Sequence, residues 1–136
     1  MKKILIISAN YYTKISSEMS SEAKNALDSS KSVDGKKKLF KYEIINVPGV
    51  FEIPVIISKN VKKYDGFVAL GCVIKGETPH FDFISQATTN AIMKLSIDYK
   101  KPVGNGIITC LNKEQAEARS KKGREAAEAV ISVLLK

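Results

Sequence analysis

The stretch GFVALGCVI, residues 66–74, decides the fold of this chain. It is almost wholly apolar, and a polar segment follows it, as is typical of a strand buried on both faces at the centre of a parallel sheet. Working outward, shorter apolar runs predict further strands over residues 4–9, around residues 42–45 and over residues 103–110.

Segments with helical spacing of apolar residues follow each predicted strand. These segments cover residues 16–27, residues 52–63, about residues 80–99, and residue 113 to the end of the chain, with a break at Gly123. Four βα units in series predict a three-layer α/β/α sandwich with a four-stranded parallel sheet. A length of 136 residues fits one domain over residues 1–136.

The charge of +8 comes almost entirely from lysine, since Arg119 and Arg124 are the only arginines. Proteins that read nucleic acids rely on the bidentate contacts of arginine, so scattered lysines predict a solvated surface rather than a nucleic-acid site. The positive charge still favours anionic ligands such as phosphates. No apolar run approaches the roughly 18 residues of a membrane span, and no signal-peptide cleavage pattern is present, so we expect a cytoplasmic protein.

The chain offers few residues for metal or thiol chemistry. Cys72 and Cys110 both lie in apolar runs, where a free cysteine usually behaves as a small hydrophobic residue. Their spacing fits neither a metal site nor a disulfide framework, and His80 is the only histidine. We therefore do not expect a zinc site.

Parallel α/β sheets bind ligands at the carboxyl ends of their strands, so the residues that follow each strand are the candidates for chemistry. Gly76 and Thr78 precede a helix, where backbone N–H groups favour a phosphate, although Thr78 fits a helix cap equally well. His80 has an unperturbed pKa near neutrality and suits proton transfer or a structural role. Tyr11 and Tyr12 suit stacking on a planar ring or closure of the core.

Charged residues near the end of the chain also leave two interpretations open. Arg119, Lys121 and Lys122 suit either a second phosphate contact or a charged helix face beside a break. Glu52, at the start of a predicted helix, is favourable with the helix dipole whether or not it touches a ligand.

Two long motifs in this chain resemble the lumazine synthase family. VPGVFEIP (residues 47–54) resembles the family motif VPGAFEIP, with Val50 in place of the usual alanine, and LGCVIKGETPHFDF (residues 70–83) resembles LGxVIRGxTxHxDY. Residues 102–109, then Gln115, Ala116 and Arg119, and finally residues 122–127, resemble later family segments in the expected order. The resemblance implies a flavodoxin-like fold.

The resemblance also implies a reaction, that of 6,7-dimethyl-8-ribityllumazine synthase, a transferase. It condenses 5-amino-6-(D-ribitylamino)uracil with 3,4-dihydroxy-2-butanone 4-phosphate, releases phosphate and water, and is the penultimate step of riboflavin biosynthesis. No metal or redox cofactor takes part. The family further implies a homopentamer whose active sites lie between neighbouring subunits, and riboflavin synthase as a candidate partner.

Site residues follow from the motifs position by position. His80 matches the acid/base, and Asn105 matches a pocket position supplied by the neighbouring subunit. The other matches are the pyrimidine-stacking Tyr11; the residues Val50, Phe51 and Glu52 that hold the ring and ribityl chain; the pocket residues Cys72, Val73 and Ile74; the phosphate loop Gly76, Glu77 and Thr78; and the phosphate-binding Arg119 and Lys122, with Arg119 reaching across from the neighbour.

The chain departs from the family pattern in one place near this site. The segment between Arg119 and Lys122 is several residues shorter than usual. This leaves open the assembly of pentamers into decamers or a 60-subunit shell. Two other functions also remain open: a non-catalytic module that binds a phosphorylated or flavin-like ligand, and a thiol enzyme that uses Cys72 and His80.

Overall fold

A computed structural model describes residues 1–76 and 80–136 of the chain. The strands are β1 (Lys2–Ala9), β2 (Phe40–Val47), β3 (Gly66–Ile74) and β4 (Val103–Cys110). The helices are α1 (Thr13–Ser29), α2 (Ile53–Asn60), α3 (His80–Tyr99), α4 (Lys113–Ala118) and α5 (Lys122–Leu134), and a 3-10 turn, η1 (Val50–Glu52), precedes α2.

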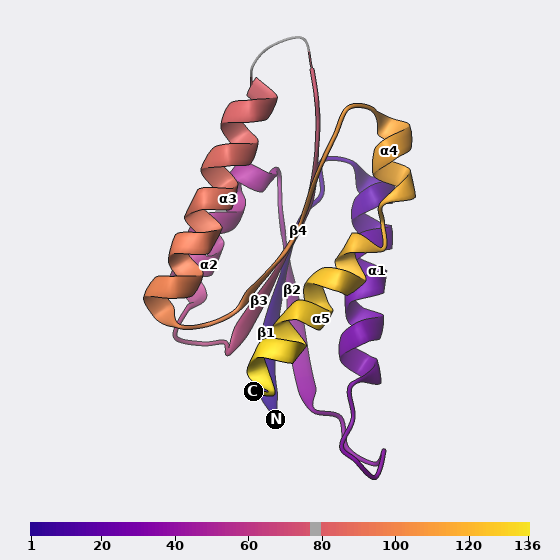
Figure 1. Ribbon diagram of the computed structural model, residues 1–136, viewed down its shortest axis with the longest axis vertical. Helices are drawn as coiled ribbons and strands as arrows, with labels where there is room; N and C mark the ends of the chain where they lie inside the picture. Colours follow the sequence, from indigo (N-terminus) through magenta and orange to yellow (C-terminus); the bar gives the residue numbers. More distant parts are fainter. Residues whose placement is uncertain (77–79) are drawn as a thin grey trace.

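The four strands form one parallel sheet in the order β2-β1-β3-β4. Helices α2 and α3 cover one face of the sheet, and α1, α4 and α5 cover the other (Figure 1). Both termini lie at the end of the sheet opposite α4 (Figure 1). The predicted three-layer α/β/α sandwich is therefore confirmed.

Strands β1 and β3 are mostly apolar because each contributes side chains to two cores, one on each face of the sheet. Ile4 and Ile6 pack against α1 and α5, whereas Leu5 and Ile7 face α2 and α3. All four side chains are fully buried. A strand covered on both faces has no polar side, which explains the continuous apolar runs that dominate the sequence.

Most predicted boundaries are confirmed, and the largest difference concerns the last helical region. The strands over residues 66–74 and 103–110 and the helix over residues 80–99 begin and end as predicted. The first helix starts three residues earlier than predicted, at Thr13, and the predicted helix over residues 52–63 divides into η1 and a shorter α2. In the described part of the chain, no helix has both the length and the apolar character that a membrane crossing requires.

The prediction of a helix break at Gly123 is wrong. The break lies at residues 119–121, and Gly123 is the second residue of α5. A Cβ atom at Gly123 would lie 2.2 Å from the backbone oxygen of Met19, in α1. The glycine therefore serves the close approach of α5 to α1, because no larger residue fits between the two backbones.

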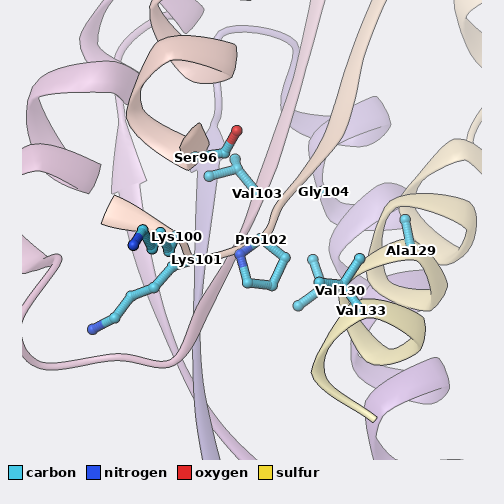
Figure 2. Close-up of a pocket in the computed structure, with 9 residues that line it drawn as sticks. All are labelled: Ser96, Lys100, Lys101, Pro102, Val103, Gly104, Ala129, Val130 and Val133. Carbon is cyan, nitrogen blue, oxygen red and sulfur yellow. The ribbon is translucent and has the colours of Figure 1, made fainter. Parts of the chain in front are cut away.

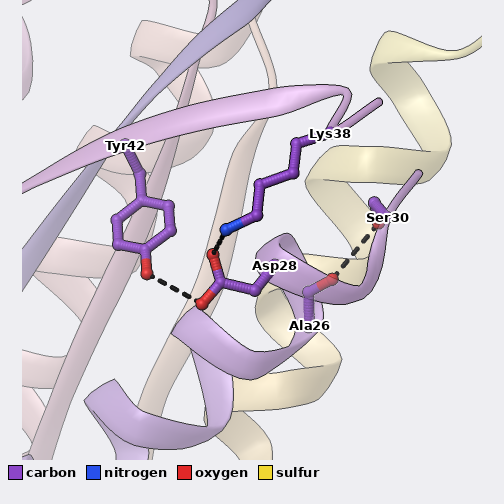
Figure 3. A network of polar contacts seen from close by, with 5 residues as sticks. All are labelled: Ala26, Asp28, Ser30, Lys38 and Tyr42. Carbon is purple, nitrogen blue, oxygen red and sulfur yellow. Dashed lines mark hydrogen bonds and ion pairs between the residues drawn. The ribbon is translucent and has the colours of Figure 1, made fainter. Parts of the chain in front are cut away.

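A polar network ties the end of α1 to the edge strand β2 (Figure 3). The hydroxyl of Tyr42 donates to Oδ2 of Asp28 at 3.1 Å, and Nζ of Lys38 lies 3.4 Å from Oδ1 of the same carboxylate. The Ser30 hydroxyl donates to the Ala26 carbonyl at 3.2 Å and holds the last turn of the helix. Burial, followed by the nearby Asp28, raises the pKa of Tyr42, so its hydroxyl remains a donor in this network.

We predict that Gly123→Ala destabilises the protein. The added methyl group must push α5 away from α1, and overpacking of this kind costs about 1–3 kcal/mol of unfolding free energy. Urea unfolding followed by circular dichroism measures the change. Gly76→Ala is the control, because a Cβ there meets no atom of the described residues within 4 Å; equal stability of the two variants would contradict the close-packing role.

Candidate active site

The carboxyl ends of β1, β2 and β3 bring the first group of predicted site residues to one edge of the sheet. Ala9 is level with Val47, and Ser8 is level with Leu70, so the residues that follow these positions are neighbours in space. We call these residues the first group: Tyr11, Val50, Phe51, Glu52, Cys72, Val73, Ile74 and Gly76. Glu77 and Thr78 of the predicted phosphate loop lie outside the described residues.

The turn η1 packs directly onto β3. Val50 is buried, and a Cβ atom at Gly71 would lie only 2.4 Å from its Cγ1 atom. Phe51 points the other way and is 60% exposed, while Glu52 is half-buried. The Val50 side chain is thus committed to the core, which leaves its backbone and the side chains of Phe51 and Glu52 to face a ligand.

The two tyrosines after β1 have different surroundings. Tyr12 is half-buried against the core beneath α1, and burial, followed by the nearby Cys72, raises its pKa. Tyr11 is 75% exposed, and its ring meets that of Tyr12 edge-on with centroids 4.9 Å apart. Of the two roles that the sequence left open, Tyr12 closes the core, whereas Tyr11 exposes its ring for stacking.

Cys72 is half-buried beside the second cysteine, Cys110. Burial, together with the hydrogen-bonded thiol of Cys110, raises the pKa of Cys72 to about 12. The thiol therefore stays protonated at neutral pH, and only a thiolate is a good nucleophile. This environment argues against the thiol enzyme that the sequence left open.

His80 is the first residue of α3 and is exposed. It follows β3 after five residues and lies on the α2–α3 side of the sheet (Figure 1). This position places an imidazole at the same end of the sheet as Tyr11 and Gly76. The chain has no other histidine.

A second group of predicted residues meets at a cavity of about 520 Å³ between β4 and the corner that joins α4 to α5. We call it the basic cavity. Arg119 and Lys122 both line this cavity, so the structure brings together the two predicted phosphate contacts outside the loop. Nζ of Lys122 lies 3.4 Å from a carboxylate oxygen of Glu125. Among the described residues, the cavity is lined by Ile107, Ile108, Thr109, Ala118, Arg119, Lys121, Lys122 and Glu125.

Local hydrogen bonds place Arg119 at this corner. Asn112 caps α4 by accepting from the backbone N–H of Gln115 at 2.9 Å, and the Gln115 side chain accepts from the backbone N–H of Leu111 at 2.8 Å. Nη1 of Arg119 donates to the Thr109 carbonyl at 3.2 Å and to Sγ of Cys110 at 3.7 Å. The guanidinium therefore lies against the end of β4.

Asn105 lies on the same edge strand and is exposed. Its side-chain oxygen accepts from the backbone N–H of Ile107 at 3.1 Å. Because β4 pairs only with β3, Asn105 lies on the outermost strand of the sheet. None of the residues that line the basic cavity belongs to the first group.

The sequence did not predict Glu125 in the basic cavity, and it left the role of Lys121 open. Lys121 adds a third cation beside Arg119 and Lys122, and Glu125 adds a counter-charge. The spacing of Lys122 and Glu125, three apart on a helix, was a usable signal for their ion pair. Among the described residues, no group of three or more His, Cys, Asp or Glu side chains is arranged to hold a metal ion.

Another cavity, of about 340 Å³, lies at the opposite end of β4 (Figure 2). Its lining comes from the end of α3, the start of β4 and α5, and includes Lys101, Val103 and Val130. None of the predicted site residues that the structure describes lines it. The residues that bear chemistry gather instead at the carboxyl end of the sheet, as expected for parallel strands.

Comparison with known proteins agrees with this geometry. The family model described as 6,7-dimethyl-8-ribityllumazine synthase matches residues 1–136. The chain belongs to this family. Proteins with that name from Bartonella bacilliformis and Bartonella tribocorum are 39% and 40% identical to the chain, and each match covers 96% of the chain and 87% of the relative.

A third relative, 6,7-dimethyl-8-ribityllumazine synthase 1 of Rhizobium meliloti, is 38% identical over 96% of the chain and 88% of its own length. Membership in the lumazine synthase family makes the chain a transferase, and it catalyses the condensation step of riboflavin biosynthesis that yields 6,7-dimethyl-8-ribityllumazine. The non-catalytic binding module that the sequence left open is thereby set aside.

We predict that the native lumazine synthase chain resists alkylation at Cys72. Its raised pKa leaves almost no thiolate at about pH 7.5. Iodoacetamide treatment followed by peptide mass spectrometry measures the modification, with the urea-unfolded protein as the control in which both cysteines react. Rapid alkylation of folded protein at Cys72, with parallel loss of activity, would support the thiol mechanism instead.

Proposed function

We propose that the chain condenses 5-amino-6-(D-ribitylamino)uracil with 3,4-dihydroxy-2-butanone 4-phosphate in active sites shared by neighbouring copies of a homopentamer. The observation that supports this proposal is the separation of the site residues into two groups. The first group lies at the ends of β1, β2 and β3, whereas Arg119 and Lys122 line a cavity on the edge strand. Each site takes the first group from one copy and the basic cavity from the next.

The first group holds the pyrimidine. The exposed ring of Tyr11 stacks on the flat heterocycle, as aromatic side chains do. Phe51, Glu52 and the backbone of Val50 hold the ring edge and ribityl chain, and Cys72, Val73 and Ile74 line the pocket. Asn105 of the neighbouring copy completes this pocket, because an exposed position on an edge strand faces outward.

The second group holds the phosphate of the sugar substrate. Arg119 of the neighbour donates to the phosphate oxygens, and Lys122 adds charge close by. Gly76, with Glu77 and Thr78, cradles the same phosphate from the copy that holds the pyrimidine. A short loop with glycine before a helix suits this task, because backbone N–H groups at a helix start attract anions.

The reaction requires little covalent chemistry from the protein. The amine of the uracil attacks the ketone and forms an imine with loss of water; phosphate then leaves, and ring closure expels a second water. Both substrates carry their own reactive groups, so holding them together supplies much of the rate enhancement. His80, at the start of α3, transfers the protons that the imine and the departing phosphate require.

The surface of α3 favours assembly with further copies. Only Thr88 and Ile92 of this helix are buried. Four of its large apolar side chains are largely exposed: Phe83 (68%), Met93 (60%), Ile97 (65%) and Tyr99 (46%). Apolar surface of this extent on one helix is expected to pack against another subunit.

The family resemblance implies the number of subunits and the next enzyme, and the compartment is the one expected from the sequence. We propose five subunits around α3, a cytoplasmic location, and riboflavin synthase as the enzyme that receives the product. Exposed phenylalanine, methionine and isoleucine side chains on α3 are consistent with a central helix contact between the five copies.

We predict that Arg119→Ala raises the KM for the sugar phosphate by about 10- to 100-fold, the loss expected for hydrogen bonds to a charged group. The KM for the uracil should change by no more than about twofold, since Arg119 lines only the basic cavity. Steady-state kinetics with each substrate varied in turn measures both values. Arg124→Ala is the matched control, because the only other arginine lies outside this cavity.

Complementation between two impaired variants, assayed with the sugar phosphate well below its wild-type KM, tests the shared site. His80→Ala should lower kcat by about 100-fold, the lower end for general acid–base catalysis, because the substrates are intrinsically reactive. Subunits of His80→Ala and Arg119→Ala, refolded together in equal amounts, should regain about one quarter of wild-type activity, the fraction of boundaries at which both residues are intact. Activity no greater than that of the two parents would place each site within a single chain.

A further inference from the structure

Cys110 is the last residue of β4, and its side chain is 1% exposed. Its sulfur lies 3.7 Å from Nη1 of Arg119, and the backbone oxygen of the preceding Thr109 lies 3.2 Å from the same nitrogen. Nη1 of a guanidinium carries two hydrogens, so these two acceptors occupy both. Each acceptor belongs to the end of a strand, which is a rigid support.

This arrangement restricts a side chain that would otherwise be free. Arginine on a surface normally samples many rotamers, and ordering it has an entropic cost at the moment when a ligand binds. Within the described part of the chain, both side-chain hydrogen bonds of Arg119 leave from Nη1. Nε and Nη2 therefore keep their donors for a ligand in the cavity that Arg119 lines.

Neither acceptor is a carboxylate, which matters for an anion site. A carboxylate beside Arg119 would orient the guanidinium but would cancel its charge. The nearby Cys72, whose pKa burial raises to about 12, is a protonated thiol at neutral pH and adds no negative charge to this cluster. The guanidinium is thus oriented without a carboxylate partner among the described residues.

We propose that Cys110 is a positioning residue for the phosphate half of the reaction: its sulfur, with the Thr109 carbonyl, fixes the Arg119 guanidinium so that Nε and Nη2 face the basic cavity. The consequence for catalysis rests on the proposed role of Arg119 at the phosphate. The contact itself does not depend on that role, so the two are testable separately.

The kinetic test compares Cys110→Val, which removes the acceptor, with Cys110→Ser, which restores one. Sulfur is a weak acceptor and the Thr109 carbonyl remains, so Cys110→Val should raise the KM for the sugar phosphate and the inhibition constant of inorganic phosphate by about three- to tenfold. The KM for the uracil should stay within about twofold of wild type, and Cys110→Ser should recover most of the loss. Cys110→Ala replaces Cys110→Val if the larger side chain prevents folding.

Two comparisons separate positioning from a general packing defect. Ile4→Val removes one methylene from the same core without contact to Arg119, and should leave both KM values unchanged. In an Arg119→Ala background, Cys110→Val should have no further effect on phosphate inhibition. Equal losses for both substrates, or an undiminished effect in that background, would overturn the proposal.

A crystal structure of the Cys110→Val enzyme provides the readout that is independent of activity. Arg119 should occupy one conformer in the wild type and leave the Thr109 carbonyl, or divide among several conformers, in the variant. An unmoved guanidinium in the variant would overturn the positioning role. If Arg119 moves as expected while Arg119→Ala leaves the phosphate KM unchanged, the positioning stands and the proposed phosphate role of Arg119 fails.

Discussion

The parallel pairing of β3 with β4 is the interaction on which the rest of the structure depends. It runs from Phe67 opposite Val103 to Ile74 opposite Cys110, and a further hydrogen bond joins the Lys75 N–H to the Cys110 carbonyl at 2.8 Å. Since β3 is occupied on its other side by β1, this pairing makes β4 the edge of the sheet. The end of β3 therefore lies inside the sheet, whereas the end of β4 lies at its outer edge.

The same register fixes how the two halves of the site are connected within one chain. It brings Cys110 beside Cys72, which belongs to the first group. The corner after α4 places Arg119 in contact with the Cys110 sulfur. One buried thiol therefore contacts a residue from each half. The sheet, and not a loop, therefore holds the two groups of residues at a fixed separation.

Close backbone packing fixes the basic cavity from the other side. A Cβ atom at Gly104 of β4 would lie 2.1 Å from the backbone oxygen of Ala126, and one at Gly123 would lie 2.2 Å from that of Met19. Helix α5 is thus in close contact with β4 at one point and with α1 at another. Lys122 begins this helix, so its place in the cavity follows from core packing that residues far from the cavity determine.

The sequence predicted the elements well where apolar runs end sharply, as at residues 66–74 and 103–110, because local polarity marks these ends. It misplaced the last helix break because glycine has the same local signature whether it ends a helix or admits a neighbouring backbone. It left Tyr11 and Tyr12 undecided, since only burial distinguishes two adjacent residues of one type. The roles of the site residues came from motif resemblance, and the contact between Arg119 and Cys110 depends on a corner that no periodicity encodes.

The charges of the basic cavity suit a ligand that is also a leaving group. Arg119, Lys121 and Lys122 against Glu125 give a net charge of three minus one, or +2. A phosphate monoester carries about −1.5 to −2 charges at neutral pH, so the two nearly balance. The ion pair between Lys122 and Glu125 is partly exposed, and such pairs contribute little, so the proposed phosphate would displace Glu125 at small cost. In the proposed site, the lumazine no longer carries the phosphate once it has been eliminated, and the basic cavity would cease to retain the product.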